Sequence, residues 1–312
     1  MMFKMKKVWI FLLLFFVFAC NTGSNGNEPF VNFRSGTQGV IFDFVPNQPP
    51  YKIYDDERVN VLLQVENRGA YPVGKQLDKI YLSGFDHQLI YPLDNFNGKQ
   101  IPDLEGKTID NRGIVGKDYV EFQLGVNPLT SAHYPFKMMA TACYGYQSIA
   151  ETPICIDPNP FSRGSSAKVC VPNSLGLGNQ GGPVSVSNVN VEARKGRTSL
   201  TFNVQNVGSG DVYKRDSMSH CNPYSGSELD FKDLDFVEVV DVLFVGGESI
   251  KGFCKNLVDN NFVRLQNNVG SFTCTVDTDN VGSEQTRVLR VILDYGYRSV
   301  LFKDFDLIHV PR

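Results

Sequence analysis

The sequence contains little that indicates catalysis or nucleic-acid binding. It has four histidines and one tryptophan in 312 residues. The nucleophile elbow G-x-S-x-G, the zinc motif H-E-x-x-H and the phosphate-binding loop are all missing. Basic residues are not in excess, because 30 lysines and arginines face 33 acidic residues and the formal net charge is −3. These absences predict no catalytic residue, no cofactor and no nucleic-acid partner, so an enzyme is not expected.

Two short motifs match catalytic or cofactor-binding patterns, but both stand in the wrong context. Residues 176–181 fit G-x-G-x-x-G, which binds a dinucleotide only when a helix follows, and here a proline and an alternating strand follow. Residues 165–168 fit S-x-x-K without the companion motifs of the acylating enzymes. We therefore interpret both as parts of a connecting loop.

Long apolar runs are also scarce, and the one that occurs lies at the N-terminus. Residues 8–19 are apolar and follow three lysines, yet the run is shorter than the roughly 20 residues that span a bilayer. This pattern predicts a signal peptide over residues 1–19. Ala19 and Cys20, followed by a polar glycine-rich stretch, resemble the lipobox of prokaryotic lipoproteins. Cys20 is therefore the expected lipidation site, residues 20–35 the tether, and the extracytoplasmic face of the cell membrane the expected location. The alternative is plain secretion with an incidental Cys20.

The chain has seven cysteines, an odd number for an exported protein. With Cys20 assigned to lipid, the others can pair completely as disulfides: Cys143, Cys155, Cys170, Cys221, Cys254 and Cys274. We expect the pairs Cys143–Cys155, Cys254–Cys274 and Cys170–Cys221, although the spacing leaves other connectivities open. A zinc site is the alternative reading, but no Cys-x-x-Cys occurs, so no metal site is predicted.

Short alternating strands dominate the rest of the chain. No convincing amphipathic helix occurs, and the best candidate, residues 227–234, would make only one or two turns. Strands separated by Pro, Gly and Asn turns, among them a hairpin turn expected at residues 267–270, predict an all-β protein with two tandem immunoglobulin-like antiparallel β-sandwiches. The first is expected over residues 36–158 and the second over 183–312, with a Pro- and Gly-rich connector at 159–182.

Two pairs of matching segments indicate that the sandwiches are copies of one module. Leu63–Ala70 and Phe202–Ser209 are both strands that run into Asn-x-Gly, which we expect to be a turn with positive φ. Tyr144–Ser148 and Tyr295–Ser299 share the motif Tyr-Gly-Tyr. Each copy is expected to end in two separate strands, at 136–146 and 153–156 in the first and at 288–293 and 300–308 in the second.

The tyrosines of the second motif alternate around a glycine, so each pair shares one face of its strand. Packing in the core or at a sheet edge is the expected role, because both copies carry the motif at the same place. The alternative is a carbohydrate-binding module in which exposed rings stack on sugars. Its candidate residues are Tyr144, Tyr146, Tyr295 and Tyr297.

Two acidic clusters are candidates for calcium, namely residues 55–57 and the group Asp230, Asp233 and Asp235. Calcium needs several oxygens that converge, and acids adjacent in sequence usually point in different directions. We therefore expect both clusters to be solvated turns.

A strand that ends in Val-(Glu/Gln)-Asn-x-Gly-(Ala/Ser), followed by a second strand, resembles CARDB domains, the cell-adhesion-related, immunoglobulin-like modules of bacterial and archaeal surface proteins. The resemblance implies a binding, adhesion or structural role on the cell surface, with a surface protein or glycan as partner. It transfers no site residues, because the motif is a turn. We expect recognition to lie where the copies differ, in the long loops at 87–116 and 211–235.

Overall fold

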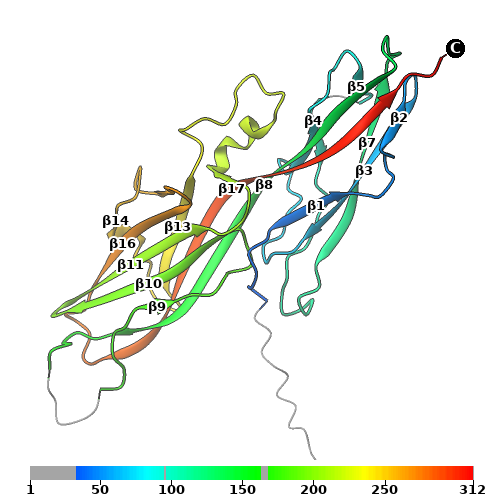
Figure 1. Ribbon diagram of the computed structural model, residues 1–312. Helices are drawn as coiled ribbons and strands as arrows, with labels where there is room; N and C mark the ends of the chain where they lie inside the picture. The colour runs from blue at the N-terminus through cyan, green and yellow to red at the C-terminus, as the bar shows by residue number, and fades with distance from the viewer. Residues whose placement is uncertain (1–32, 95, 163–167, 312) are drawn as a thin grey trace, which may run out of the picture. The chain divides into compact units, whose positions relative to one another are not determined.

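Two strands of 24 residues each, β8 (His133–Ile156) and β17 (Gln285–Ile308), form the centre of the fold. The computed structural model describes residues 33–94, 96–162 and 168–311. The predicted signal peptide and the predicted lipidation site Cys20 lie outside these residues. Antiparallel sheets dominate, as predicted for an all-β sandwich protein, and the chain forms one compact unit over Asn32–Arg312 (Figure 1).

The largest sheet has the strand order β15-β13-β17-β8-β4-β6. Besides the two long strands, it contains β4 (Lys79–Ser83), β6 (Lys99–Gln100), β13 (Phe236–Phe244) and β15 (Phe262–Arg264). Two short strands, β2 (Lys52–Tyr54) and β12 (Asp211–Tyr213), also pair with β17. The 3-10 helices are η1 (Arg215–Cys221) and η2 (Lys251–Phe253). Among the described residues, no helix is long and apolar enough to cross a membrane.

Two smaller sheets cover the large one. The first has the order β1-β3-β7-β5, with β1 (Val40–Phe44), β3 (Arg58–Asn67), β7 (Gly116–Val126) and β5 (Ile90–Pro92). The second has the order β14-β16-β11-β10-β9, with β14 (Cys254–Lys255), β16 (Val269–Asp277), β11 (Arg197–Asn206), β10 (Val184–Arg194) and β9 (Leu175–Gly176). Strands β3 and β11 bury every second residue, the period-two pattern that places one face on a core.

The long strands are continuous where the sequence suggested breaks. They pair antiparallel along their whole length, from Gln285 opposite Ile156 to Ile308 opposite His133. The predicted separate strands at 136–146 and 153–156, and those at 288–293 and 300–308, are therefore wrong. The reason is that neither the glycine nor the proline interrupts the hydrogen bonds between β8 and β17. Gly145 lies opposite Gly296, and the backbone N of Pro153 faces the outer edge of β8, where no ladder hydrogen bond needs an N–H.

This continuity joins the two predicted modules. Strand β4 pairs with the first part of β8, and β13 pairs with the first part of β17. The later part of each long strand then runs into the other end of the large sheet, as the green β8 and red β17 show (Figure 1). Neither 36–158 nor 183–312 thus contains all the strands of its own sandwich. We call the parts before and after the connector the first half and the second half.

Local turn predictions had mixed outcomes. Asn267 and Asn268 both have positive φ, 50° and 68°, and form the predicted tight turn before β16. Residues 227–234 do not form the helix that was the best candidate in the sequence. The segment 176–181 starts in β9 and leads into β10, so no helix follows its glycines.

Candidate functional site

The four predicted tyrosines meet at the centre of the long strand pair and are buried. Tyr146 lies opposite Tyr295, and Tyr144 lies opposite Tyr297. Their ring centroids are 6.1 and 5.7 Å apart, and none of the four residues is more than 3% exposed. This burial contradicts the carbohydrate-stacking alternative for these rings, because no ring face is open to a sugar. The expected packing role agrees with the geometry.

Each of these hydroxyls also accepts a hydrogen bond from the backbone of a smaller sheet or its turn. The donor–acceptor pairs are Val40 N with Tyr144 Oη (3.3 Å), Tyr71 N with Tyr146 Oη (3.2 Å), Val184 N with Tyr295 Oη (3.2 Å) and Gly210 N with Tyr297 Oη (2.7 Å). Burial raises the pKa of all four phenols, that of Tyr297 to about 12. The tyrosines thus remain neutral and fasten both halves to the central strands.

The Asn-x-Gly repeats also contact the central tyrosines, but they do not have the positive φ that the sequence suggested. In each copy the asparagine Oδ1 accepts a bond from the glycine N, at 3.2 Å for both Asn67 and Asn206. Neither Gly69 nor Gly208 has positive φ. Instead, a Cβ on Gly69 would lie 1.8 Å from the Tyr146 hydroxyl, and one on Gly208 would lie 2.2 Å from that of Tyr297. Glycine is therefore required by close approach and not by left-handed backbone.

The described chain contains three disulfides, of which one pair was predicted correctly. Cys254–Cys274 is confirmed, whereas the other pairs are Cys143–Cys221 and Cys155–Cys170. The predicted Cys143–Cys155 pair is impossible because both residues lie on β8, where twelve residues span about 40 Å. Disulfides of this number indicate an oxidising, extracytoplasmic environment.

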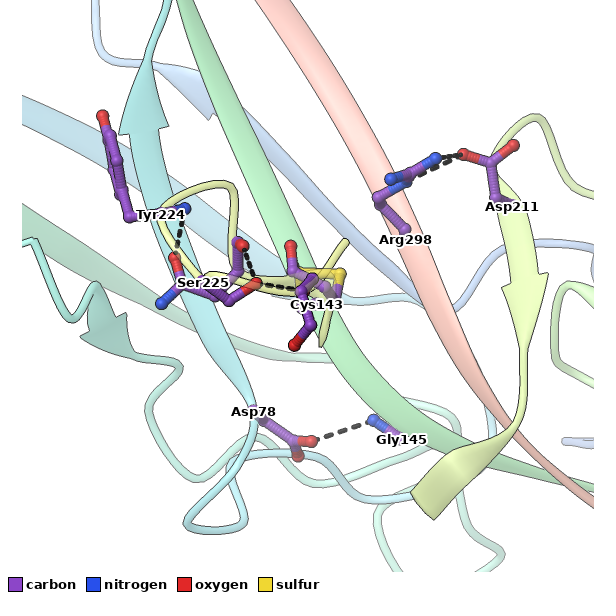
Figure 2. The surroundings of a disulfide bond; sticks show 10 residues. Asp78, Cys143, Gly145, Asp211, Tyr224, Ser225 and Arg298 are labelled. Carbon is purple, nitrogen blue, oxygen red and sulfur yellow. Dashed lines mark hydrogen bonds and ion pairs between the residues drawn. A yellow bond between two sulfur atoms is a disulfide. The ribbon is translucent and has the colours of Figure 1, made fainter. Parts of the chain in front are cut away.

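The Cys143–Cys221 disulfide fixes the loop 211–235 across the central strands. Tyr213 and Arg215 lie directly over the two central glycines, since a Cβ on Gly296 or Gly145 would come within 2.2 Å of their side chains. Arg215 also forms an ion pair of 2.9 Å with Asp294. Figure 2 shows the disulfide together with one further tie of this loop, the ion pair of Asp211 with Arg298 at 2.8 Å. It also shows the bond from Gly145 N to Asp78, 2.9 Å long, which lies outside the loop. The loop is thus held rigidly.

The two long loops meet at a group of aromatic side chains in which His87 and Phe96 are exposed, Tyr224 is half-buried and Phe85 is buried. The His87 ring lies 5.3 Å from Phe85, 4.9 Å from Phe96 and 5.4 Å from Tyr224, measured between centroids. Phe96 and Tyr224 are 4.9 Å apart. We call Phe85, His87, Phe96 and Tyr224 the aromatic surface. Three of its members come from the first half and one from the second.

The aromatic surface is ordered but not hollow. The Tyr224 hydroxyl donates a hydrogen bond to the Leu82 carbonyl, and burial raises the pKa of Tyr224 to about 12. The cavity beneath the rings measures about 10 Å³, which is the space of a single water molecule. Phe96 is 39% exposed, and His87 is also exposed. The arrangement is suited to a flat contact and does not enclose a small molecule.

The acidic clusters agree only in part with the expected solvated turns: Asp56, Glu57 and Asp230 are exposed, whereas Asp55 and Asp233 are bound by other side chains. Asp55 is buried and accepts bonds from His309 Nδ1 (2.7 Å), Leu129 N (2.8 Å) and Val310 N (3.0 Å). The bond from His309 is the main reason that the pKa of Asp55 falls to about 2. No three His, Cys, Asp or Glu side chains converge to hold a metal ion in the described parts of the chain.

Asp233, in the second cluster, accepts bonds from both Ser217 Oγ (2.6 Å) and His220 Nδ1 (3.1 Å). The residue types are those of a hydrolase triad, but the order is wrong. In a triad the histidine contacts the serine, whereas here the carboxylate lies between them. This group fixes the loop and provides no activated nucleophile.

The sequence located the two loops but not the aromatic surface that they form. No motif connects Phe96 with Tyr224, because they are brought together only by the crossing of the second-half loop onto the first half. The one available signal was the odd placement of Cys221 in a loop, which required a partner elsewhere.

Comparisons with known proteins give little further guidance. No family model matches the chain, including any for CARDB domains, and no curated protein matches it. One solved structure, a DUF4466 family protein from Parabacteroides merdae, is 11% identical, with 82% of this chain and 99% of that chain covered and a TM-score of 0.19. Another, a collagen adhesin from S. aureus, is 10% identical, with coverages of 88% and 94% and a TM-score of 0.15. TM-scores this low carry no argument about fold or function.

Proposed function

We propose that this protein is a membrane-anchored, extracytoplasmic binding module that presents its aromatic surface to a partner at the cell surface. The observation that carries the proposal is the meeting of the two long loops. They are the segments in which the halves differ most, and their side chains meet in the aromatic surface, where His87 and Phe96 are exposed.

Physical chemistry supports a binding role for this surface. Aromatic side chains supply much of the binding energy at protein interfaces, because they bury a large area with few rotatable bonds. The Cys143–Cys221 disulfide and the bond from Tyr224 to Leu82 hold the surface in place before any partner arrives. Such preorganisation reduces the entropy lost on binding.

Binding to intact cells of the producing organism tests the role of the surface. Phe96→Ala should weaken binding of the purified protein at least tenfold without shifting its melting temperature by more than a few degrees. Phe231→Ala is the matched control, because Phe231 is 67% exposed in the loop 211–235 but lies outside the aromatic surface. Equal binding by wild type and Phe96→Ala would contradict the proposal. Protease treatment of the cells separates a protein partner, whose binding is lost, from a glycan partner.

The lipid anchor is a separate part of the proposal. It is supported by the lipobox-like sequence at Cys20 and by the oxidising environment that the disulfides indicate. Two acyl chains on Cys20 would be sufficient for stable anchoring. Cys20→Ser should therefore release the protein from membranes in a fractionation assay. Retention of that variant in the membrane fraction would contradict lipidation while leaving the binding role intact.

A further inference from the structure

One edge of β17 has a gap in its strand pairing. On this edge β12 (Asp211–Tyr213) pairs with Gly296–Arg298 of β17, and β2 pairs with Asp306–Ile308. Asp306 N donates to Tyr51 O and Asp55 N donates to Ile308 O, both at 2.9 Å, so the even-numbered residues face this edge. By the same alternation Val300, Phe302 and Asp304 point their N–H and C=O groups outward. None of these groups has a backbone partner among the described residues.

Two of the three outward residues along this gap, Val300 and Phe302, have exposed apolar side chains. Val300 is 40% exposed and Phe302 is 56% exposed. They stand two residues apart and therefore lie on the same face of the sheet, beside Thr141 and Met139 of β8. An exposed edge with apolar side chains is a template for pairing with another chain, and proteins normally protect such edges with charge or proline.

The equivalent edge of β8 has that protection. Gly145 N donates to Asp78, so the odd-numbered residues of β8 face outward. Six residues after the central glycine, β8 has Glu151 where β17 has Phe302. Glu151 forms ion pairs with Arg34 and Arg290.

Two residues further along, β8 has Pro153 at the position that Asp304 occupies in β17. Proline offers no N–H to an incoming strand. Both edges thus carry a charge, Glu151 on β8 and Asp304 on β17, but only the β8 edge also has a proline. The β17 edge is therefore the open one, because all its outward N–H groups remain available to an added strand. This contrast indicates that the open edge has a use.

We infer that the gap at residues 299–305 of β17 accepts a short extended peptide segment of a partner protein by strand addition. Only an extended polypeptide offers alternating donors and acceptors at the spacing of these N–H and C=O groups. The segment would carry apolar side chains next to Val300 and Phe302. This inference concerns a different surface from the aromatic surface and goes beyond the proposed function.

The flanking strands define the length of the occupant. Strands β12 and β2 occupy the same edge on both sides, so the gap admits about seven residues, or roughly 23 Å. A second copy of β17 does not fit, because that strand continues for 24 residues and would have to displace both neighbours. The segment must therefore leave the sheet at both ends of the gap.

The test uses a capped heptapeptide of alternating valine and threonine with a lysine at each end, added to the purified chain at millimolar concentration. Hydrogen exchange followed by NMR should show at least tenfold slower exchange at the amides of Val300, Phe302 and Asp304. Copying the closed edge with F302E/D304P should abolish this protection. The reciprocal variant E151F/P153D should open the β8 edge and create new protection at residues 149–153.

Several outcomes would overturn the inference. They are the absence of protection in the wild type, and equal protection in wild type and F302E/D304P. If F302E/D304P does not fold, as judged by its melting temperature, F302E alone provides the same comparison. Protection of the three amides in the free monomer would show that the chain covers its own edge. Protection that depends on protein concentration without peptide would identify a second copy as the occupant.

Discussion

The two halves use almost the same contacts to reach the central tyrosines, yet they differ in how they connect to the large sheet. After Asn67 the first half reaches β4 at Lys79, through a connection of residues 68–78. After Asn206 the second half makes a much longer excursion before β13 starts at Phe236. That excursion crosses the central glycines and contacts the first half. The contacts that both halves share thus attach them to the central strands, and the longer connection of the second half forms the aromatic surface with the first half.

The largest expected loss of stability comes from removing the disulfide that ties this longer connection to β8. Cys143 and Cys221 are 78 residues apart, so their disulfide closes a much longer loop than Cys155–Cys170, with 15 residues. In the chain-entropy model the C143S/C221S variant should lose about 4.5 kcal/mol of unfolding free energy, against about 3 kcal/mol for C155S/C170S. Urea unfolding of both variants measures the difference. A smaller loss for C143S/C221S would show that the loop is held mainly by its other contacts.

A smaller difference in stability is expected between alanine substitutions at the two central glycines, Gly145 and Gly296. Alanine at Gly296 would clash with the ring of Tyr213, which is fully buried and cannot move aside. Alanine at Gly145 meets the end of the Arg215 side chain, which can rotate away. We expect Gly296→Ala to cost about 2 to 3 kcal/mol and Gly145→Ala about 1 kcal/mol or less. Equal losses, measured by thermal unfolding, would mean that Arg215 is as rigid as Tyr213.

These glycines also show how far sequence patterns predicted this fold. The all-β class and the Asn267–Asn268 turn depend on local patterns, and local patterns were sufficient for them. Gly145 and Pro153 are local breaker signals, so β8 was predicted as two strands. Whether a glycine or proline ends a strand depends on what lies opposite it and on which edge it faces, and neither is visible in a single sequence.

The candidate site depended even more on distant contacts. The choice of Cys155 as partner for Cys143 followed from the false break in β8, because two separate strands would have placed them side by side. The correct partner, Cys221, is 78 residues away. The aromatic surface was missed for the same reason: Tyr224 reaches Phe96 because its loop, which this disulfide ties to β8, crosses to the first half.

A carboxylate is bound at the end of each long strand, and the one at the end of β17 should make the stability of the fold depend on pH. At the end of β17, His309 and two backbone N–H groups bind Asp55, whereas at the end of β8 Lys168 binds Asp157 at 2.6 Å. The pKa of Asp55 is about 2 in the folded chain and about 4 when unfolded. The unfolded state therefore takes up the proton first, and stability should fall as the pH drops from about 4 to about 2.

Asp55→Asn removes this titration. Its unfolding free energy should be lower than that of the wild type at pH 7, and the difference should shrink as the pH falls from about 4 to about 2. Urea unfolding at a series of pH values measures both profiles. Parallel profiles for the two proteins would show that Asp55 is not responsible for the acid sensitivity.

The smallest expected effect concerns the Tyr224 hydroxyl, which joins the loop 211–235 to strand β4 of the first half. Tyr224→Phe keeps the ring in the aromatic surface but removes the bond to the Leu82 carbonyl, at a cost of about 1 kcal/mol. Burial raises the pKa of Tyr224 to about 12, so the wild type should also lose stability as the pH rises from about 10 to 12, while the unfolded chain ionises. Tyr224→Phe should lose less over that range, because the buried tyrosines of the centre titrate equally in both proteins. Identical alkaline profiles would place the Tyr224 hydroxyl in solvent and would leave the disulfide as the main tie between the loop and the first half.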